Sequence, residues 1–149
     1  MKRQIPVIVT MDTKGPEALF LKEFIGRRGF DAPIIDVGTR QSRFDPDYPY
    51  DEVADRAGVT LDELAAMRRD NMMRTMGEGA SQILLEYWAK GELGGVISIG
   101  GNQGTSIASF AMESLPIGIP KLIISTVASG NIRPYVGYKD IMVVFSVFD

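Results

Sequence analysis

The amino-acid sequence predicts an α/β fold: a doubly wound, mostly parallel five-stranded sheet in a Rossmann-like three-layer sandwich. Runs rich in Val and Ile and bounded by turn residues have strand character. Most of them are apolar on both faces, as strands are when helices cover both sides of a parallel sheet. Helical patterns separate the runs, which is typical of right-handed crossovers. The predicted strands are Ile5–Thr10, Pro33–Val37, Gly95–Ile99, Lys121–Thr126 and Ile141–Val147.

The helices between these strands carry recognisable start and stop signals. The first opens beside Pro16, because proline suits the first turn of a helix, and a glycine after a cationic turn ends it. The second begins at Thr60, where Glu63 three residues later completes a capping box. The predicted helices are Gly15–Gly29, Thr60–Gly91 and Thr105–Ser114.

Two segments depart from this alternation. The Gly-Glu-Gly sequence at 77–79 costs the second helix up to about 2 kcal/mol relative to alanine, so we expect a kink or a close backbone approach there. The polar segment Thr39–Val59 shows at most one helical turn, at Asp51–Ala57. A loop of that length in a compact domain is usually functional, an interface, or mobile.

Composition favours one ordinary globular domain over residues 1–149. Apolar residues make up 45% of the chain and charged residues 23%, which is typical of a folded domain of common size. The net charge of -3 argues against binding to nucleic acid, because that needs a basic surface. Cysteine and histidine are absent, which excludes disulfides, thiolate or imidazole metal sites, and Cys–His catalysis.

Neither end of the sequence has the pattern of a targeting or membrane segment. The start, MKRQIPVIVTMD, has a short apolar stretch and no small-residue cleavage site. The apolar run Ile141–Phe148 is far too short to cross a bilayer. We therefore expect a cytoplasmic protein that does not act at a membrane.

Small, hydroxylated or glycine-rich residues follow four of the predicted strands. In an open parallel sheet the carboxyl ends of the strands share one edge, and ligands bind in the crevice beyond it. We therefore expect the four loops to converge. They are Met11–Gly15, Asp36–Thr39, Gly100–Ser106 and Ser125–Gly130.

The loop Gly100–Ser106 is the strongest binding signal. Its glycines let a ligand approach the backbone, and the helix that follows offers unpaired N–H groups to an anion. Thr105 and Ser106 add hydroxyl donors. The loop lacks the GK[ST] ending of a Walker A motif and the GxGxxG spacing of dinucleotide folds. The alternative is a tight strand-to-helix turn with Thr105 as an ordinary N-cap.

Charged residues stand beside these loops. Lys14 suits a phosphate contact, although a solvated surface lysine is the simpler interpretation. Asp12 suits either Mg²⁺ or the first turn of the following helix. Asp36 has the position of a ribose-binding carboxylate in dinucleotide folds. Glu78 is an acidic residue whose placement suits catalysis, with packing as the simpler explanation.

The loop after the fourth strand also has two interpretations. Ser125, Thr126 and Ser129 with Gly130 suit a second anion or a sugar. The same residue types commonly form side-chain-to-backbone bonds within turns, so a purely structural role stays open.

With these loops assigned, the sequence resembles a known family. The segments MDTKGPEALFLKEFI, IIDVGT, ISIGGNQGT, SLPIGIPKLIISTVASG, PYVGYKDI and SVFD are similar to the amino-terminal domain of the Tm-one-like ATP-binding family. That family is named for the tomato mosaic virus resistance protein and includes bacterial relatives. The similarity covers essentially the whole chain in the same order.

The resemblance implies a Rossmann-like domain that binds ATP, followed by a larger carboxyl-terminal domain. We expect Mg²⁺ to accompany the ATP. Where the family usually has GGSGGT, Asn102 and Gln103 replace the small Ser-Gly pair; they either narrow the phosphate cradle or add amide donors to it. The resemblance and the strand-end argument together place the nucleotide at Asp12, Thr13, Lys14, Asp36, Gly100, Gly101, Asn102, Gln103, Gly104, Thr105, Ser106, Ser125, Thr126, Ser129 and Gly130.

Three functions therefore follow from the sequence. The first is a nucleotide-binding domain. The second is an enzyme for a small phosphorylated or carboxylated metabolite, with Lys14, Asp12 or Glu78 as proton carriers. The third is a structural module in which Ile141–Phe148 and Thr39–Val59 form a homo-oligomer or domain interface.

Overall fold

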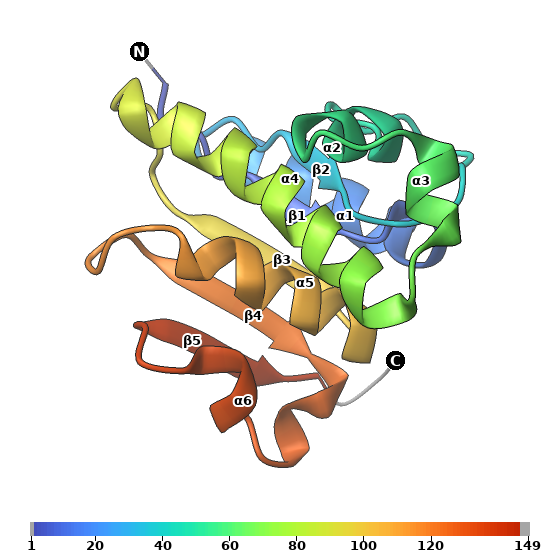
Figure 1. Cartoon of the computed structure of the whole chain (residues 1–149). Helices are drawn as coiled ribbons and strands as arrows, with labels where there is room; N and C mark the ends of the chain where they lie inside the picture. Colours follow the sequence, from blue (N-terminus) through green and yellow to red (C-terminus); the bar gives the residue numbers. More distant parts are fainter. Residues whose placement is uncertain (1, 147–149) are drawn as a thin grey trace.

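The computed structural model describes residues 2–146, so the last residue of the predicted fifth strand, Val147, lies outside the described residues. All five predicted strands are present, and all pair in parallel in the order β2-β1-β3-β4-β5. The predicted α/β fold with a doubly wound sheet is thereby confirmed (Figure 1). The strands are β1 (Val7–Val9), β2 (Ile34–Asp36), β3 (Val96–Gly100), β4 (Lys121–Ser125) and β5 (Ile141–Phe145).

The strand order creates a reversal between β1 and β3. The chain first moves from β1 outward to β2, then returns to place β3 on the other side of β1. The connections after β1 and β3 therefore leave in opposite directions, and the crevice between them is where open α/β sheets bind ligands.

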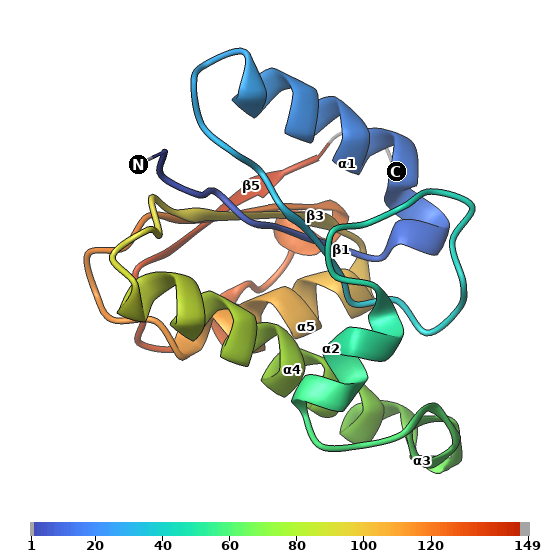
Figure 2. The same cartoon turned by 90° about the horizontal axis from the view of Figure 1, so that it is seen from above.

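Helices cover the two faces of the sheet unequally (Figure 2). In the described part of the chain, α1 lies by itself on one face, where it packs on Val7 and Val9. The opposite face, which includes Ile8 and Ile123, packs against residues of α2, α4 and α5. The helices are α1 (Met11–Gly26), α2 (Tyr50–Arg56), α3 (Leu61–Ala66), α4 (Arg69–Ala89), α5 (Asn102–Glu113), the 3₁₀ turn η1 (Thr126–Ser129) and α6 (Arg133–Val136).

The first two helices differ from their predicted limits for local reasons. Helix α1 starts at Met11, but Lys14 has non-helical angles (φ -124°, ψ 24°), so the predicted start at Gly15 marks the segment after this break. The predicted helix from Thr60 to Gly91 is two helices, because the backbone is extended at Met67 and Arg68. The capping box at its start is confirmed: Thr60 N donates to Glu63 Oε2 at 2.8 Å, and Glu63 N donates to Thr60 Oγ1 at 3.2 Å.

The third helix begins three residues earlier than predicted. Gly101 is the N-cap of α5, and Thr105 N already donates to Gly101 O at 2.9 Å inside the first turn. Thr105 is therefore not the N-cap, and most of the predicted loop Gly100–Ser106 is helix.

The glycines within α4 mark a close approach rather than a kink. Helix α4 is continuous over its length. A Cβ at Gly79 would lie 2.0 Å from the backbone oxygen of Val53 in α2, and one at Gly77 would lie 2.7 Å from Phe110 Cδ1 in α5. The missing side chains let both helices pack against α4.

The segment between β2 and α3 is anchored at several points. The predicted helical turn at Asp51–Ala57 is present as α2, which begins and ends one residue earlier. Ser42 Oγ donates to Met11 O at 3.2 Å, and Phe44 covers the bare backbone of Gly15. Asp47 accepts a hydrogen bond from Ile34 N at 2.7 Å. Among residues 2–146, no helix combines the length and apolarity needed to span a membrane.

Candidate functional site

A polar pocket of about 650 Å³ opens at the carboxyl edge of the sheet, between the connections that follow β1, β2 and β3. It lies at the reversal of strand order, and its size is in the range of small-molecule sites. Seven predicted residues line it, and four unpredicted residues join them. The lining residues are Thr10, Asp12, Thr13, Lys14, Thr39, Arg40, Arg69, Gly101, Asn102, Gln103 and Gly104.

The amino terminus of α5 forms one wall. Gly101 has no side chain with which to cap the helix, so the first-turn N–H groups have no partner within the helix. A Cβ at Gly100 would lie 3.0 Å from Gly104 Cα, so strand end and helix start touch backbone to backbone. Outside the backbone of its own helix, a Cβ at Gly104 would meet Ile99 O at 3.9 Å, which is an ordinary van der Waals contact. The protein therefore has room for one more methyl group beside this first turn.

The start of α1 forms the opposite wall. Thr10 Oγ1 and Thr13 Oγ1 are 2.7 Å apart, and Lys14 N donates to Thr10 O at 2.9 Å. Asp12 is exposed in the first turn, where its carboxylate faces Gly38: a Cβ on that glycine would lie 2.9 Å from Asp12 Oδ1. This wall brings hydroxyl groups, one carboxylate and one ammonium group to the pocket.

Two arginines that the sequence reasoning missed complete the lining. Arg40 comes from the loop after β2, and Arg69 is the first residue of α4. Within residues 2–146 neither forms an ion pair with a carboxylate. The strand-end argument was sufficient to find Arg40, which directly follows a predicted loop. Arg69 had no such signal, because the break before α4 was not predicted.

Asp36 does not line this pocket. It is 1% exposed, and its Oδ1 accepts hydrogen bonds from Met11 N at 3.0 Å and Gly38 N at 2.8 Å. Burial raises the pKa of Asp36, the two N–H donors oppose that rise, and the nearby carboxylate of Asp12 adds to it. In this structure the carboxylate ties the start of α1 to the end of β2.

Other predicted residues lie beneath the pocket. Thr105 and Ser125 are fully buried, and their hydroxyl oxygens are 2.6 Å apart, which joins α5 to the end of β4. Ser125 Oγ also accepts from Val127 N at 3.2 Å. Ser106 Oγ donates back to Asn102 O at 3.1 Å within α5. These hydroxyl groups support the wall and are occupied by protein partners.

The remaining predicted residues lie along the continuation of this edge. Thr126 approaches Gly101, with its Oγ1 3.6 Å from where a Cβ on that glycine would be. Ser129 and Gly130 are exposed and do not line the pocket. Tyr135 in α6 donates its hydroxyl to Asn102 Oδ1 at 3.1 Å. Glu78 is exposed on α4 and is also outside the pocket lining.

The donor groups suit a phosphate-bound cation better than a metal held by protein alone. In the part of the chain that the structure describes, no three Asp or Glu side chains gather closely enough to hold a metal ion. Magnesium usually keeps few protein ligands and takes the rest from phosphates and water. Asp12 fits that role of a single carboxylate ligand.

Comparison with known proteins gives a consistent result. The model of the family described as "Uncharacterised protein family (UPF0261) N-terminal domain" matches residues 3–149. A UPF0261 protein of Clostridium tetani is 40% identical over all of this chain and 37% of its own length, and one of Rhizobium meliloti is 37% identical over the same shares. The "ToMV susceptible protein tm-1(GCR26)" of Solanum lycopersicum is 34% identical over 95% of this chain and 21% of its own.

These relatives confirm the resemblance that the sequence motifs indicated. The chain spans just over a third of the length of the bacterial relatives that it matches, 37% in both cases. The match with the tomato protein covers 95% of this chain.

Proposed function

The chain belongs to the UPF0261 family, through the amino-terminal domain of that family, and on this premise we propose that it binds ATP with Mg²⁺ in the polar pocket. The observation that carries the proposal is the charge arrangement of the lining. Two arginines without a carboxylate partner in the described chain face the same space as the uncapped first turn of α5. A polyanion satisfies both kinds of donor together.

The phosphates are the part of the ligand that the site supports best. Helix N-termini attract anions through free N–H groups and the helix dipole, and guanidinium groups pair with phosphate oxygens in a bidentate way. Arg40 and Arg69 approach from outside α5, and Lys14 from the start of α1. Asp12 and the phosphates would hold Mg²⁺ between them.

Adjacent arginines at the start of α4 provide a matched test. Both Arg68 and Arg69 are exposed, but Arg69 lines the pocket and Arg68 does not. Calorimetric titration with ATP and Mg²⁺ should show saturable binding by the parent protein. We expect Arg69→Ala to weaken that binding about tenfold, which corresponds to about 1.4 kcal/mol, and Arg68→Ala to leave it unchanged. Equal affinities in the two variants would contradict the proposed position of the phosphates.

The second candidate function is an enzyme for a small phosphorylated metabolite, and one observation favours it. Asp12 and Lys14, a carboxyl group and an amino group that can carry protons, line the same pocket. Titration with adenosine and with inorganic triphosphate separates the candidates. If the site is specific for ATP, ATP should bind more tightly than inorganic triphosphate, because the nucleoside adds contacts. Equal affinities for ATP and inorganic triphosphate, together with phosphate transfer that disappears in Lys14→Ala, would favour the enzyme.

A further inference from the structure

The sheet face that carries α1 is covered at one end and bare at the other. Residues in register point to the same face, and the row Val7, Ile97, Leu122 and Met142 crosses the sheet from β1 to β5. Burial falls along that row: Val7 is fully buried under α1, Ile97 and Leu122 are half-buried, and Met142 is 65% exposed.

A second row repeats the same gradient. Ile99 and Ile124 are half-buried, and Val144, in register with them, is 44% exposed. On the other face, Ile123 and Ile141 are buried against the helical layer, and Phe145, at the carboxyl end of β5, is 49% exposed. The helical layer therefore covers the face with Ile123 and Ile141 up to the last residue of β5, whereas Met142 and Val144 on the α1 face are both exposed.

The flank of α1 that borders this bare region is aromatic. The opposite flank of α1 faces β2, because Lys22 Nζ lies 2.6 Å from Asp47 Oδ2, and Asp47 accepts a hydrogen bond from Ile34 N in β2. Phe24 is two positions, or about 200°, further around the helix, so it faces the opposite way, toward β3 to β5. Phe20 stacks on it, with ring centroids 5.9 Å apart, and both rings are exposed.

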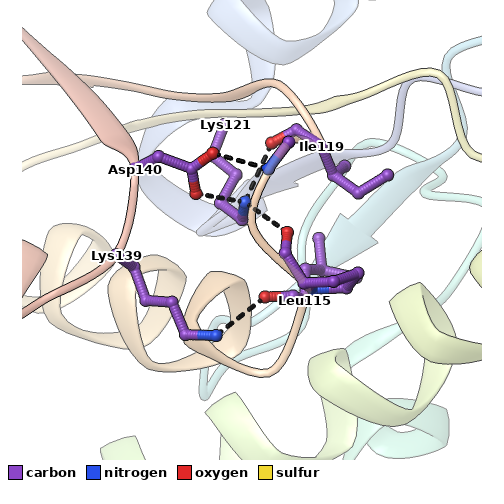
Figure 3. A network of polar contacts seen from close by, with 7 residues as sticks. Leu115, Ile119, Lys121, Lys139 and Asp140 are labelled. Carbon is purple, nitrogen blue, oxygen red and sulfur yellow. Dashed lines mark hydrogen bonds and ion pairs between the residues drawn. The ribbon is translucent and has the colours of Figure 1, made fainter.

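An apolar hollow of about 480 Å³ continues the bare region to the amino edge of the sheet, where Ile25, Ile97 and Met142 line it. The one buried ammonium group beside it is already paired (Figure 3). Lys121 Nζ lies 2.7 Å from Asp140 Oδ1 and donates to the carbonyl oxygens of Pro116 and Ile119, both at 2.9 Å. This pairing lowers the pKa of Asp140 to about 2, so the hollow offers apolar contact rather than a free charge.

We propose that this bare face is the docking surface for the part of the full-length UPF0261 chain that follows the amino-terminal domain. The bacterial relatives are nearly three times as long as the matched segment, which covers 37% of them. Ser146, the last described residue, still donates from its N–H to Ser125 O beside β5. Sequence that continues from this point in the longer relatives begins at the border of the bare face. A helix laid across it would supply the second layer that a parallel sheet needs.

The test compares this chain alone with the same chain continued by the residues that follow the matched segment in the Clostridium tetani relative. Both proteins are exposed to hydrogen peroxide, and oxidation of each methionine is followed by mass spectrometry. We expect Met142 to oxidise at least tenfold more slowly in the continued protein. Met67, half-buried between α3 and α4, is the matched control and should oxidise at the same rate in both.

Three outcomes would overturn the proposal. The first is an equal rate at Met142 in both proteins. The second is protection of Met142 in the chain alone that increases with its concentration, because a second copy would then cover the face. The third comes from Met142→Asp in the chain alone. Because Met142 is 65% exposed, this substitution should leave the denaturation midpoint unchanged, whereas a marked fall would mean that the side chain already packs within this chain.

Discussion

The middle of α4 and the start of α5 both carry closely spaced glycines, but their surroundings differ. Around Gly77 and Gly79 the protein fills the space that a side chain would take, with Phe110 and the backbone of Val53. A Cβ at Gly104 would make only an ordinary contact outside its own helix, with Ile99 O at 3.9 Å, and the residue lines the polar pocket. The first pair serves helix packing, whereas at Gly104 a methyl group would meet no clash and would lie beside the pocket.

The cations show the same contrast. The ammonium group of Lys121 has a carboxylate and two carbonyl groups around it. Arg40 and Arg69 face a cavity and have no carboxylate partner among residues 2–146. The neighbours of a glycine or a cation therefore indicate whether it serves packing or is available for binding.

The largest effect is expected from Gly79→Ala. The new Cβ would meet the carbonyl oxygen of Val53, a backbone atom that cannot rotate away. We expect the free energy of unfolding to fall by about 3 kcal/mol, measured by urea denaturation. ATP affinity of the folded protein should not change, since Gly79 is remote from the pocket lining. A stability equal to the parent's would mean that α2 and α4 are not packed as closely as described.

A smaller loss is expected from Gly77→Ala. Here the obstacle is the Phe110 ring, which can move, and alanine's better helix propensity offsets part of the cost. The net loss should be about 1 kcal/mol. The double variant Gly77→Ala/Phe110→Leu should lose less than the two single variants together. Strict additivity of the three measured values would argue against a direct contact between these positions.

The smallest expected effect is the dependence of the free energy of unfolding on pH that the buried carboxyl group of Asp36 causes. Because burial raises the pKa of Asp36 in the folded protein, the folded state keeps its proton at pH values where the unfolded chain has lost it. Asp36 therefore lowers the free energy of unfolding as pH rises above about 4. Asp36→Asn keeps the acceptor oxygen without the charge, so its stability relative to the parent should increase from pH 4 toward neutrality. A difference that is constant with pH would contradict the raised pKa.

Much of the fold was predictable because it rests on local patterns. The apolar runs placed all five strands to within a few residues, and Thr60 with Glu63 marked a helix start that the structure confirms. The break between α3 and α4 was missed because Met67 and Arg68 fit a continuous helical pattern. No cap or turn residue at these two positions signals the extended backbone that separates α3 from α4.

The sequence predicted which edge of the sheet carries the site, but not which side chains line the pocket. Parallel strands bring their carboxyl ends together, so Asp12, Lys14 and Gly104 were found by position alone. Whether a hydroxyl group faces the pocket or the core depends on the helix phase: α5 begins at Asn102, which turns Thr105 inward to Ser125. Arg69 reaches the site from a helix whose start the sequence did not reveal.

The central claim is that the space beside Gly104 is kept open for the phosphates of a nucleotide, and Gly104→Ala tests it most directly. Urea denaturation and calorimetric titration with ATP and Mg²⁺ are measured together on the parent and the variant. Outside its own helix the added methyl makes only an ordinary contact, with Ile99 O at 3.9 Å, so we predict stability equal to the parent's or up to about 1 kcal/mol higher. We predict an ATP affinity at least tenfold lower. Unchanged affinity in an equally stable variant would contradict the claim.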